Sequence, residues 1–253
     1  MEQLPDELLL RIFSFLTFTQ RIFLRVLSWR WSQLMFDNSL LRTISIRRAR
    51  CEDGKLQALF TAAKKLTEVN LFSCHFLNGS YILNAGLTRL RMMDLTDTAV
   101  TDLTLSKILK ETKELTELHL AGTRVSDNSL PHIIDLPKLK YISVPPENDH
   151  GFSRSSVLAI VRNCATLRTL DCQEGYFFNR KELHRIVEDN PLLNGLHIPY
   201  AFVDDPTLMF IVESLANLTY ICVCETEVTQ DCVEMLKSTK PSLEICFNVN
   251  HTP

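Results

Sequence analysis

Two histidines and two aspartates are the residues in this sequence best suited to general acid–base chemistry. His119 and His197 carry imidazoles, and Asp94 and Asp171 carry carboxylates, at similar places in a repeating pattern. The four side chains fall in separate short segments, however, and no serine or cysteine nucleophile is evidently paired with a base. We therefore expect them to be polar residues of a binding face, and we predict no catalytic residues.

Cys222 and Cys224 are the second group with chemical potential. Residues two apart share one side of a strand, and His197 occupies the equivalent place in the preceding segment. Thiolates and imidazoles are ligands of structural zinc, but such a site needs four ligands, and no clear fourth is present. The sequence accordingly predicts no metal and no cofactor.

Composition places the chain among ordinary globular proteins. It has 253 residues, of which 45% are hydrophobic and 23% are charged, and a net charge of -3. No segment has the roughly 18 apolar residues of a membrane span, and acids interrupt the opening stretch, unlike a secretory signal. Eight dispersed cysteines are typical of reduced thiols, and no nucleotide-binding glycine loop or HExxH motif is present. We therefore expect a cytoplasmic or nuclear protein, or both, with no membrane and no nucleic-acid partner.

A sequence repeat predicts the strands and helices in which these residues lie. The pattern LxxLxL recurs, and its first residues are spaced by 25, 24, 25, 24, 28, 26, 25 and 25 positions, within the range of leucine-rich repeats. The copies begin at Leu41, Leu66, Leu90, Leu115, Leu139, Leu167, Leu193 and Leu218, with a degenerate ninth copy, LEICFN, from Leu243. A register kept over nine copies predicts a repeat architecture.

A second sequence pattern within the units indicates a helix after each strand. Ten residues after the first leucine come a hydrophobe and a polar pair, as in Val203-Asp204-Asp205, and helical apolar spacing follows. In the two longer units the equivalent hydrophobes are predicted to be Phe152 and Phe178, which puts the extra residues between strand and helix, in PPENDHGF and CQEGYFF. The first of these loops either is a recognition element or reflects a change in unit length that has no function.

The predicted fold class is α/β, a leucine-rich-repeat solenoid with parallel strands on the concave side and helices on the convex side. Positions 1, 4 and 6 of each unit point into the core, whereas positions 3, 5 and 7 face the concave side. Strands about 4.8 Å apart make this face on the order of 40 Å long, which suits a protein partner. The candidate target-binding residues are Arg47, Glu68, Phe72, Asp94, Glu117, His119, Tyr141, Asp171, His197 and Tyr220. The run RRAR that begins at Arg47 is either a solvated edge or a phosphate-binding element.

Residues 1–40 precede the repeats and differ from them in charge. Residues 1–50 hold eight Arg against four acids, so the rest of the chain carries a net charge of about -7. We expect three helices here, the first starting at Pro5, the second from about Thr19 to Leu27 and the third around Trp29 to Phe36. So small a unit cannot bury all of its large apolar side chains, which predicts a surface for a partner.

The segment LPDELLLRIFSFLTFTQRIFLRVLSWRWSQLMFDNSLL resembles an F-box, the three-helix motif by which substrate receptors of SCF ubiquitin ligases dock on a Skp-type adaptor. The matching residues are Leu4-Pro5, Glu7, Leu8, Ile12-Phe13-Ser14-Phe15-Leu16, Leu24-Arg25-Val26, Arg30-Trp31 and Leu40-Leu41. Trp29 departs from the pattern, since many members carry a cysteine or a basic residue there. The adaptor-binding residues implied by the resemblance are Leu4, Pro5, Leu8, Ile12, Phe13 and Leu16, with Val26 and Trp31 supporting the helical packing.

An F-box followed by repeats of about 25 residues is similar to the F-box/LRR proteins. The similarity implies an F-box over residues 1–44, a repeat domain of eight to nine units over residues 45–253, and no enzymatic activity of its own. It also implies a substrate-recognition subunit that binds the adaptor and cullin complex and an unknown protein target, and so promotes ubiquitination and proteasomal degradation. Two alternatives remain open. The helical segment could be only a cap on the solenoid, and the chain could be an interaction scaffold of ribonuclease-inhibitor type without ubiquitin transfer.

Overall fold

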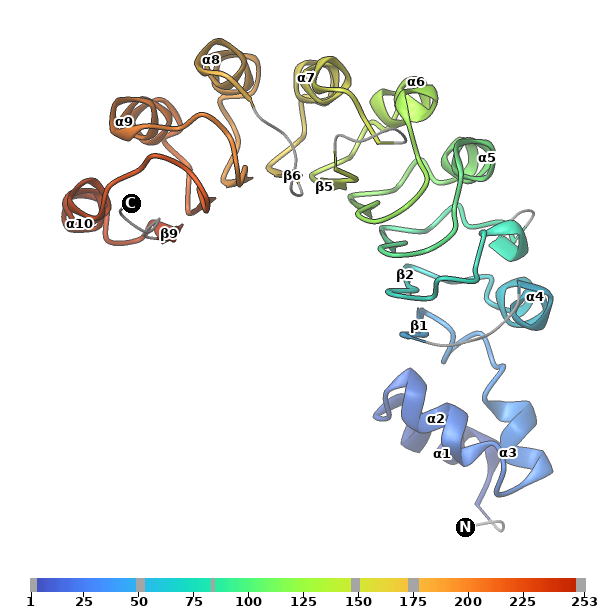
Figure 1. Ribbon diagram of the computed structural model, residues 1–253. Coiled ribbons are helices and arrows are strands. Elements are labelled where there is room, and N and C mark those ends of the chain that lie inside the picture. The colour runs from blue at the N-terminus through green and yellow to red at the C-terminus, as the bar shows by residue number, and fades with distance from the viewer. Residues whose placement is uncertain (1–3, 49–52, 83–84, 147–150, 173–177, 249–253) are drawn as a thin grey trace.

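The computed structural model describes residues 4–48, 53–82, 85–146, 151–172 and 178–248. These residues form an arc in which the strands line the inner side and the helices of the repeats line the outer side (Figure 1). The strands pair in parallel and in chain order within one sheet. They are β1 (Thr43–Ser45), β2 (Glu68–Asn70), β3 (Met92–Asp94), β4 (Glu117–His119), β5 (Tyr141–Val144), β6 (Thr169–Cys172), β7 (Gly195–His197), β8 (Tyr220–Cys222) and β9 (Glu244–Cys246).

Helices precede the sheet and then alternate with its strands. The first three are α1 (Asp6–Ser14), α2 (Phe18–Leu24) and α3 (Trp29–Leu34). Those of the repeats are α4 (Asp53–Ala62), α5 (Asp102–Glu111), α6 (Leu130–Ile134), α7 (Arg154–Asn163), α8 (Arg180–Asp189), α9 (Asp205–Ser214) and α10 (Gln230–Thr239), with short 3-10 turns η1 (Ser80–Ile82) and η2 (Asp127–Ser129). The predicted solenoid is therefore confirmed.

The leucine pattern explains the core. In the second unit, for example, Leu66, Val69 and Leu71 are buried at positions 1, 4 and 6, while Glu68 and Asn70 face the concave side. A parallel ladder keeps the same alternation in every neighbouring strand, because residues of equal position are paired. The core is thus a single continuous cluster that runs the length of the arc.

The predicted helix starts are also confirmed. Asp204 and Thr229 are N-cap residues whose side chains accept hydrogen bonds from the backbone N–H groups of Thr207 and Cys232. Phe152 and Phe178 are fully buried where the shorter units place a valine. The inserted residues therefore lie between strand and helix, and residues 147–150 and 173–177 are outside the part of the chain that the structure describes.

A left-handed residue follows the strand at position 8 of most units. The residues in this conformation are Arg48, Ser73, Asp97, Gly122, Tyr200 and Glu225, with φ between 54° and 65°. In the fifth unit position 8 is Pro146, whose ring holds φ negative. The longer loop of that unit is thus associated with the loss of a turn that the preceding unit has at Gly122.

The ninth copy corrects the predicted register. Cys222 pairs with Cys246 and Tyr220 pairs with Glu244, a separation of 24 rather than 25 residues. Leu243 is still buried, but only one residue separates it from the next core residue, Ile245. A shift of one position turns every following side chain to the other face, so Cys246 lies on the concave side and not in the core.

The first three helices form a small unit with its own core. Leu9, Phe13, Trp31, Met35 and Leu40 make up that core. Pro5 is the N-cap of α1 rather than part of its first turn, and α2 begins and ends earlier than predicted, at Phe18 and Leu24. None of the helices in the described residues is long and apolar enough to cross a membrane.

The helical unit packs against the first strand of the sheet. Phe18 of α2 belongs to the core of the solenoid, together with Leu41 and Ile44. Arg21, also on α2 and buried, donates a hydrogen bond to the carbonyl oxygen of Leu40. The unit therefore covers the N-terminal end of the sheet (Figure 1).

Candidate protein-interaction surfaces

One side of α1 is apolar and exposed. Leu8, Ile12 and Phe15 recur at helical spacing and are between 40% and 82% exposed. Leu9 and Phe13, on the neighbouring side, are buried in the core of the helical unit. The helix is thus apolar on two sides, and the described chain covers only one of them.

A second exposed group lies where α2 meets α3. Its members are Phe23, Val26, Leu27 and Trp29, all at least 65% exposed. Together with Leu8, Ile12 and Phe15 they form what we call the apolar surface of the helical unit. This surface holds seven of the twelve large apolar side chains that are exposed in the described residues, although the unit is a small part of the chain. Such a concentration is typical of a site that binds another protein.

The predicted adaptor-binding residues differ in their exposure to solvent. Pro5, Leu8, Ile12 and Val26 are exposed, and Leu4 and Leu16 are half-buried. Phe13 and Trp31 are buried and pack edge to face, with ring centroids 5.5 Å apart. Trp31 supports the helical packing as expected.

Two expected roles need correction. Phe13 was expected at the surface, but its side chain is 2% exposed and packs inside the unit. Val26 was expected to support the packing, but it is 86% exposed because α2 has already ended at Leu24. Phe15, Phe23, Leu27 and Trp29 were not among the predicted contacts. The spacing of Phe15 from Leu8 along one helix face is the signal that could have identified it.

A charged contact fixes the start of the unit. Arg30 on α3 donates hydrogen bonds to the Asp6 carboxylate and to the carbonyl oxygen of Leu4 at 2.6 Å. The Leu4-Pro5 segment is thereby held against α3, beside the exposed side of α1.

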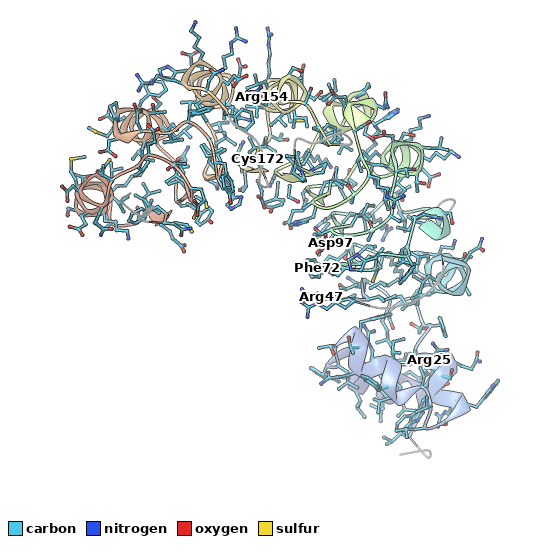
Figure 2. All side chains as sticks on the ribbon, viewed as in Figure 1. Arg25, Arg47, Phe72, Asp97, Arg154 and Cys172 are labelled. Atoms are coloured by element: carbon cyan, nitrogen blue, oxygen red, sulfur yellow. The ribbon has the colours of Figure 1, made fainter. Side chains whose placement is uncertain are left out.

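The N-terminal part of the concave face is basic and aromatic. Arg47 lies over the ring of Phe72, with the guanidinium carbon 5.1 Å from the ring centroid, and Arg48 lies at 5.9 Å from the same centroid. Figure 2 shows Arg47 and Phe72 one above the other on the inner side of the arc, with Asp97 further along. The remainder of the RRAR run lies outside the described residues.

Acidic residues follow on the next strands. Glu68 and Glu117 are exposed, and Glu68 accepts a hydrogen bond from Thr43. Asp94 is half-buried and accepts a hydrogen bond from Asn70 at 2.9 Å. The concave face therefore changes from basic to acidic within four strands.

The centre of the concave face holds a connected polar group. The hydroxyl of Tyr141 donates to Oδ2 of Asp171 at 2.8 Å, and Nδ1 of His197 lies 2.8 Å from Oδ1 of the same carboxylate. His119 stacks on Tyr141, with ring centroids 4.4 Å apart. Tyr220 is half-buried on β8. Asp171 and His197 were expected to be separate solvated residues, and the structure joins them.

The contacts within this group alter its acid–base behaviour. The hydrogen bond to Asp171, followed by one to Cys222, raises the pKa of His197 to about 10. Burial works against ionisation of Asp171, but hydrogen bonds from His197 and Tyr141 outweigh it and lower the pKa of that carboxyl. His197 and Asp171 are thus an ion pair, and neither is placed to act as a free base near pH 7.

Three cysteines gather beside His197. Sγ of Cys224 lies 3.4 Å from Sγ of Cys222 and 3.4 Å from Sγ of Cys246. Cys222 and Cys224 were considered as zinc ligands from the sequence. Cys246 was not included, because the predicted register of the ninth copy placed that residue in the core. Burial raises the pKa of Cys222, but hydrogen bonds from His197 and Cys224 outweigh it and lower that pKa to about 7.

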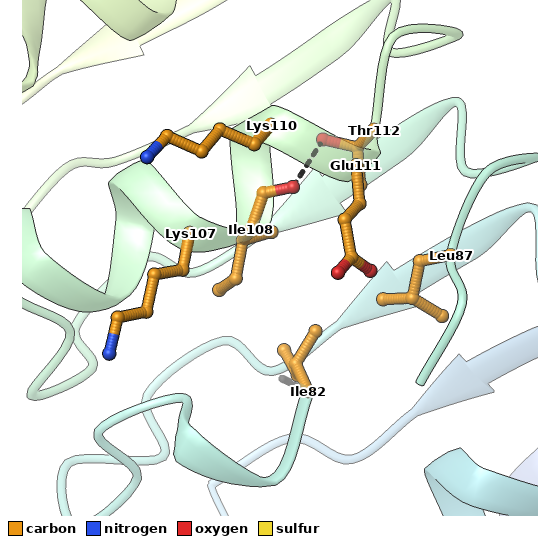
Figure 3. A pocket seen from close by; sticks show the side chains of 7 residues that line it. All are labelled: Ile82, Leu87, Lys107, Ile108, Lys110, Glu111 and Thr112. Atoms are coloured by element: carbon orange, nitrogen blue, oxygen red, sulfur yellow. Dashed lines mark hydrogen bonds between the residues drawn. The ribbon is translucent and has the colours of Figure 1, made fainter. Parts of the chain in front are cut away.

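A cavity of about 360 Å³ lies on the convex side, between η1 and α5. Its walls are the apolar side chains of Ile82, Leu87 and Ile108 together with Lys107, Lys110, Glu111 and Thr112 (Figure 3). The Thr112 hydroxyl is occupied by a hydrogen bond to the Ile108 carbonyl oxygen. No nucleophile is paired with a base among these lining residues.

Comparison with known proteins agrees with this division of the molecule. The family described as F-box-like matches residues 1–47. A chain in the crystal structure of the Rad7 and Elc1 complex from yeast is 16% identical, with a TM-score of 0.53 over 85% of this chain and 70% of that chain. Internalin C2 from Listeria monocytogenes is 14% identical, with a TM-score of 0.54 over 83% of this chain and 84% of that chain. At these identities the two structures are similar in fold.

The molecule therefore has two parts, a unit of three helices and a repeat solenoid that follows it. Its N-terminus carries an F-box-like domain, and the parallel-strand repeats that follow resemble leucine-rich-repeat proteins. This combination is typical of non-catalytic adaptor proteins.

Proposed function

We propose that this chain is the substrate-recognition subunit of an SCF-type ubiquitin ligase. Residues 1–44 bind a Skp-type adaptor, and the concave face of residues 45–253 binds a target protein. The chain itself is not an enzyme. The observation that carries the proposal is the apolar surface of the helical unit, which lies within the F-box-like segment.

The apolar surface supports the adaptor interaction through its size and its position. A cap on the solenoid needs only the side that meets β1, which Phe18 and Arg21 already provide. It does not need Leu8, Ile12 or Trp29 at the surface. Burial of a large apolar side chain contributes roughly 1.5–3 kcal/mol, so several of them suffice for a stable complex. The yeast chain of similar fold is itself part of a two-protein complex.

The concave face supports the target interaction. It presents the Arg47–Phe72 pair, exposed Glu68 and Glu117, and the Tyr141–Asp171–His197 group on rigid strands. Aromatic and charged side chains held by packing are suited to protein recognition, because little conformational entropy is lost when they bind. We place Arg47, Glu68, Phe72, Asp94, Glu117, His119, Tyr141, Asp171, His197 and Tyr220 among the target contacts.

Ubiquitin transfer would then depend on proximity. An adaptor held at one end of a rigid arc and a target held in its concavity are linked at a fixed spacing, which raises the effective concentration of the target near a conjugating enzyme. No chemistry by the receptor is required. We propose that this occurs in the cytoplasm or the nucleus, and that it leads to proteasomal degradation of the target.

The direct test measures binding of the purified chain to a purified Skp-type adaptor by calorimetry. We expect the wild type to bind, and the double variant Leu8→Asp, Ile12→Asp to lose at least about 100-fold in affinity, because two apolar contacts are replaced by charges. Both side chains are exposed, so the fold should persist, which a thermal melt checks. Leu103→Asp on α5 is the matched control, since Leu103 is equally apolar and exposed but lies on the convex side.

Co-purification from cells completes the test. Recovery of adaptor and cullin with the wild type and with Leu103→Asp, but not with the double variant, supports the receptor function. Failure of the wild type to bind any Skp-type adaptor would leave the helical unit as a cap, and the scaffold of ribonuclease-inhibitor type would then be the better description.

A further inference from the structure

The end of the concave face brings together three cysteine thiols, and His197 of the preceding strand lies beside one of them. His197 ends β7, Cys222 ends β8 and Cys246 ends β9, and the ladder pairs His197 with Cys222 and Cys222 with Cys246. Cys224 follows two residues after Cys222 and returns to the same side. The parallel register thus stacks these side chains at one edge of the sheet.

The spacing of the sulfur atoms suits a single ion. All three Sγ atoms lie within 4.8 Å of one another, and two of the separations are 3.4 Å. In a tetrahedral zinc site with Zn–S bonds of about 2.3 Å, sulfur atoms are about 3.8 Å apart. Small changes in side-chain torsion therefore suffice to admit an ion. The three thiols are free in the structure.

The imidazole of His197 is held in place by its neighbours. Its Nδ1 is engaged by the Asp171 carboxylate at 2.8 Å and faces the Cys172 carbonyl oxygen at 3.2 Å. The ring also makes a hydrogen bond with Cys222, although its nitrogen atoms lie outside the group of three sulfur atoms that are within 4.8 Å of one another. A carboxylate that holds a histidine in this way is a recurrent feature of zinc sites. The Tyr141 hydroxyl in turn fixes Asp171.

The other described cysteines show no such grouping. Cys74, Cys164, Cys172 and Cys232 are each buried in the core at separate places along the arc. Cysteines are commonly buried as small hydrophobic residues, and these four are of that kind. Cys224 and Cys246, by contrast, reach the solvent-facing side of the sheet, where apolar packing does not explain a cysteine.

We propose that Cys222, Cys224 and Cys246 bind one Zn²⁺ ion, and that the side chain of His197 turns from its place beside Cys222 to become the fourth ligand. Three thiolates and one imidazole form the closed ligand set of a structural zinc site. The ion ties β9 to β8 and β7, and among the described residues β9 is the last strand of the sheet, paired on one side with β8. Terminal repeats of a solenoid need protection, because their inner faces have no further unit to pack against. Zinc would supply that protection here, whatever the partners of the protein are.

The test is the zinc content of the full-length protein, purified under reducing conditions and measured by elemental analysis. We expect one zinc ion per chain in the wild type, and none in Cys246→Ser, whose side chain is exposed and so not needed for the fold. Cys232→Ala in the adjacent helix α10 is the matched control and should keep its zinc. Replacement of zinc by Co²⁺ should give the intense visible absorption of a tetrahedral thiolate site in the wild type and in the Cys232 variant only.

The role of Asp171, which contacts His197 and not the ion, is tested separately. Asp171→Asn removes the charge that orients His197, and it should weaken zinc binding by about 10–100-fold in competition with a chelator while leaving the stoichiometry unchanged. His197→Ala should weaken binding further and alter the Co²⁺ spectrum. Two results would overturn the proposal: a wild type that binds no added Zn²⁺, or equal loss of zinc in the Cys232 and Cys246 variants.

Discussion

Leu40 and Leu41 are adjacent in the chain, yet they bury their side chains in different cores. Leu40 packs with Phe13 and Trp31 in the helical unit, whereas Leu41 packs with Ile44 in the solenoid. The two parts of the molecule thus meet within a single peptide bond. Their contact is reinforced by Phe18 and by the hydrogen bond from Arg21 to Leu40.

This arrangement predicts that the two cores respond separately to mutation. Leu40→Ala and Leu41→Ala should each destabilise the part into which the side chain points, by roughly 2–5 kcal/mol. Both tryptophans of the chain, Trp29 and Trp31, lie in the helical unit, so their fluorescence reports on that unit, while circular dichroism is dominated by the repeats. We expect Leu40→Ala to lower the urea midpoint seen by fluorescence more than that seen by dichroism, and Leu41→Ala to do the reverse. Equal shifts of both midpoints in both variants would mean that the molecule unfolds as one unit.

Two glycines with left-handed backbone, Gly122 in the turn after β4 and Gly86 after η1, predict an unequal effect of alanine substitution. Gly122 and Gly86 both have positive φ, so alanine at either position is expected to cost about 1–2 kcal/mol. A Cβ atom at Gly122 would also lie 2.1 Å from Oδ1 of Asp97, whereas one at Gly86 would meet nothing within 4 Å. Gly122→Ala should therefore lower the free energy of unfolding more than Gly86→Ala does. Denaturant titration of the two variants measures the difference, and identical losses would show that Asp97 moves aside freely.

The carboxylate of Asp102 predicts a loss of stability in acid. It accepts hydrogen bonds from the backbone N–H of Ser126 at 2.8 Å and from the hydroxyls of Ser126 and Ser129 at 2.6 Å each. Burial disfavours its ionisation, but these hydrogen bonds outweigh burial and hold its pKa below the usual value of 3.8. A group whose pKa is lower in the folded state stabilises the protein above its unfolded pKa. That contribution is lost as the pH falls below about 3.8, through the folded value.

The acid effect can be measured with a single substitution. Asp102→Asn should reduce the free energy of unfolding at pH 7 by roughly 1–3 kcal/mol and flatten its decline below pH 4. Asp189→Asn, at the exposed end of α8, should leave both nearly unchanged. Urea titrations between pH 2 and pH 7 provide the comparison. A steep acid decline that persists in Asp102→Asn would assign it to other carboxyls, such as Asp127, whose pKa is also lowered despite burial by hydrogen bonds from Ser156 and Ser153.

The acidic part of the concave face predicts that target binding can be reduced by mutation without loss of adaptor binding. Charge reversal by Glu68→Lys and Glu117→Lys should reduce capture of the target protein, while adaptor binding stays at the wild-type level. Both side chains are exposed on the concave side, so their replacement should change the melting temperature little. Glu213→Lys on the convex helix α9 is the control for charge alone. Quantitative comparison of the proteins co-purified with each variant measures the effect, and loss of adaptor as well as target would show that the fold depends on these residues.

Patterns in the sequence were sufficient to predict the solenoid, its strand register over eight units and the exposed apolar character of its first helices. It could do so because a repeat of fixed length multiplies one weak local pattern many times, and because a forty-residue unit has too little interior for its aromatic residues. Tertiary structure alone decided which of the apolar residues face outward. Phe13 and Ile12 are neighbours in the sequence, but the packing of Trp31 buries one and leaves the other exposed.

The cysteine group is the clearest example of an arrangement that local sequence patterns do not predict. In the expected register Cys246 would occupy a core position, and two cysteines with one histidine make an incomplete metal site. The parallel pairing of β9 with β8 moves the register by one residue and places Cys246 beside Cys222. No local pattern reports such a shift in a degenerate final unit. Which side chains share a face there depends on how the terminal strand docks on its neighbour, and that docking exists only in the folded protein.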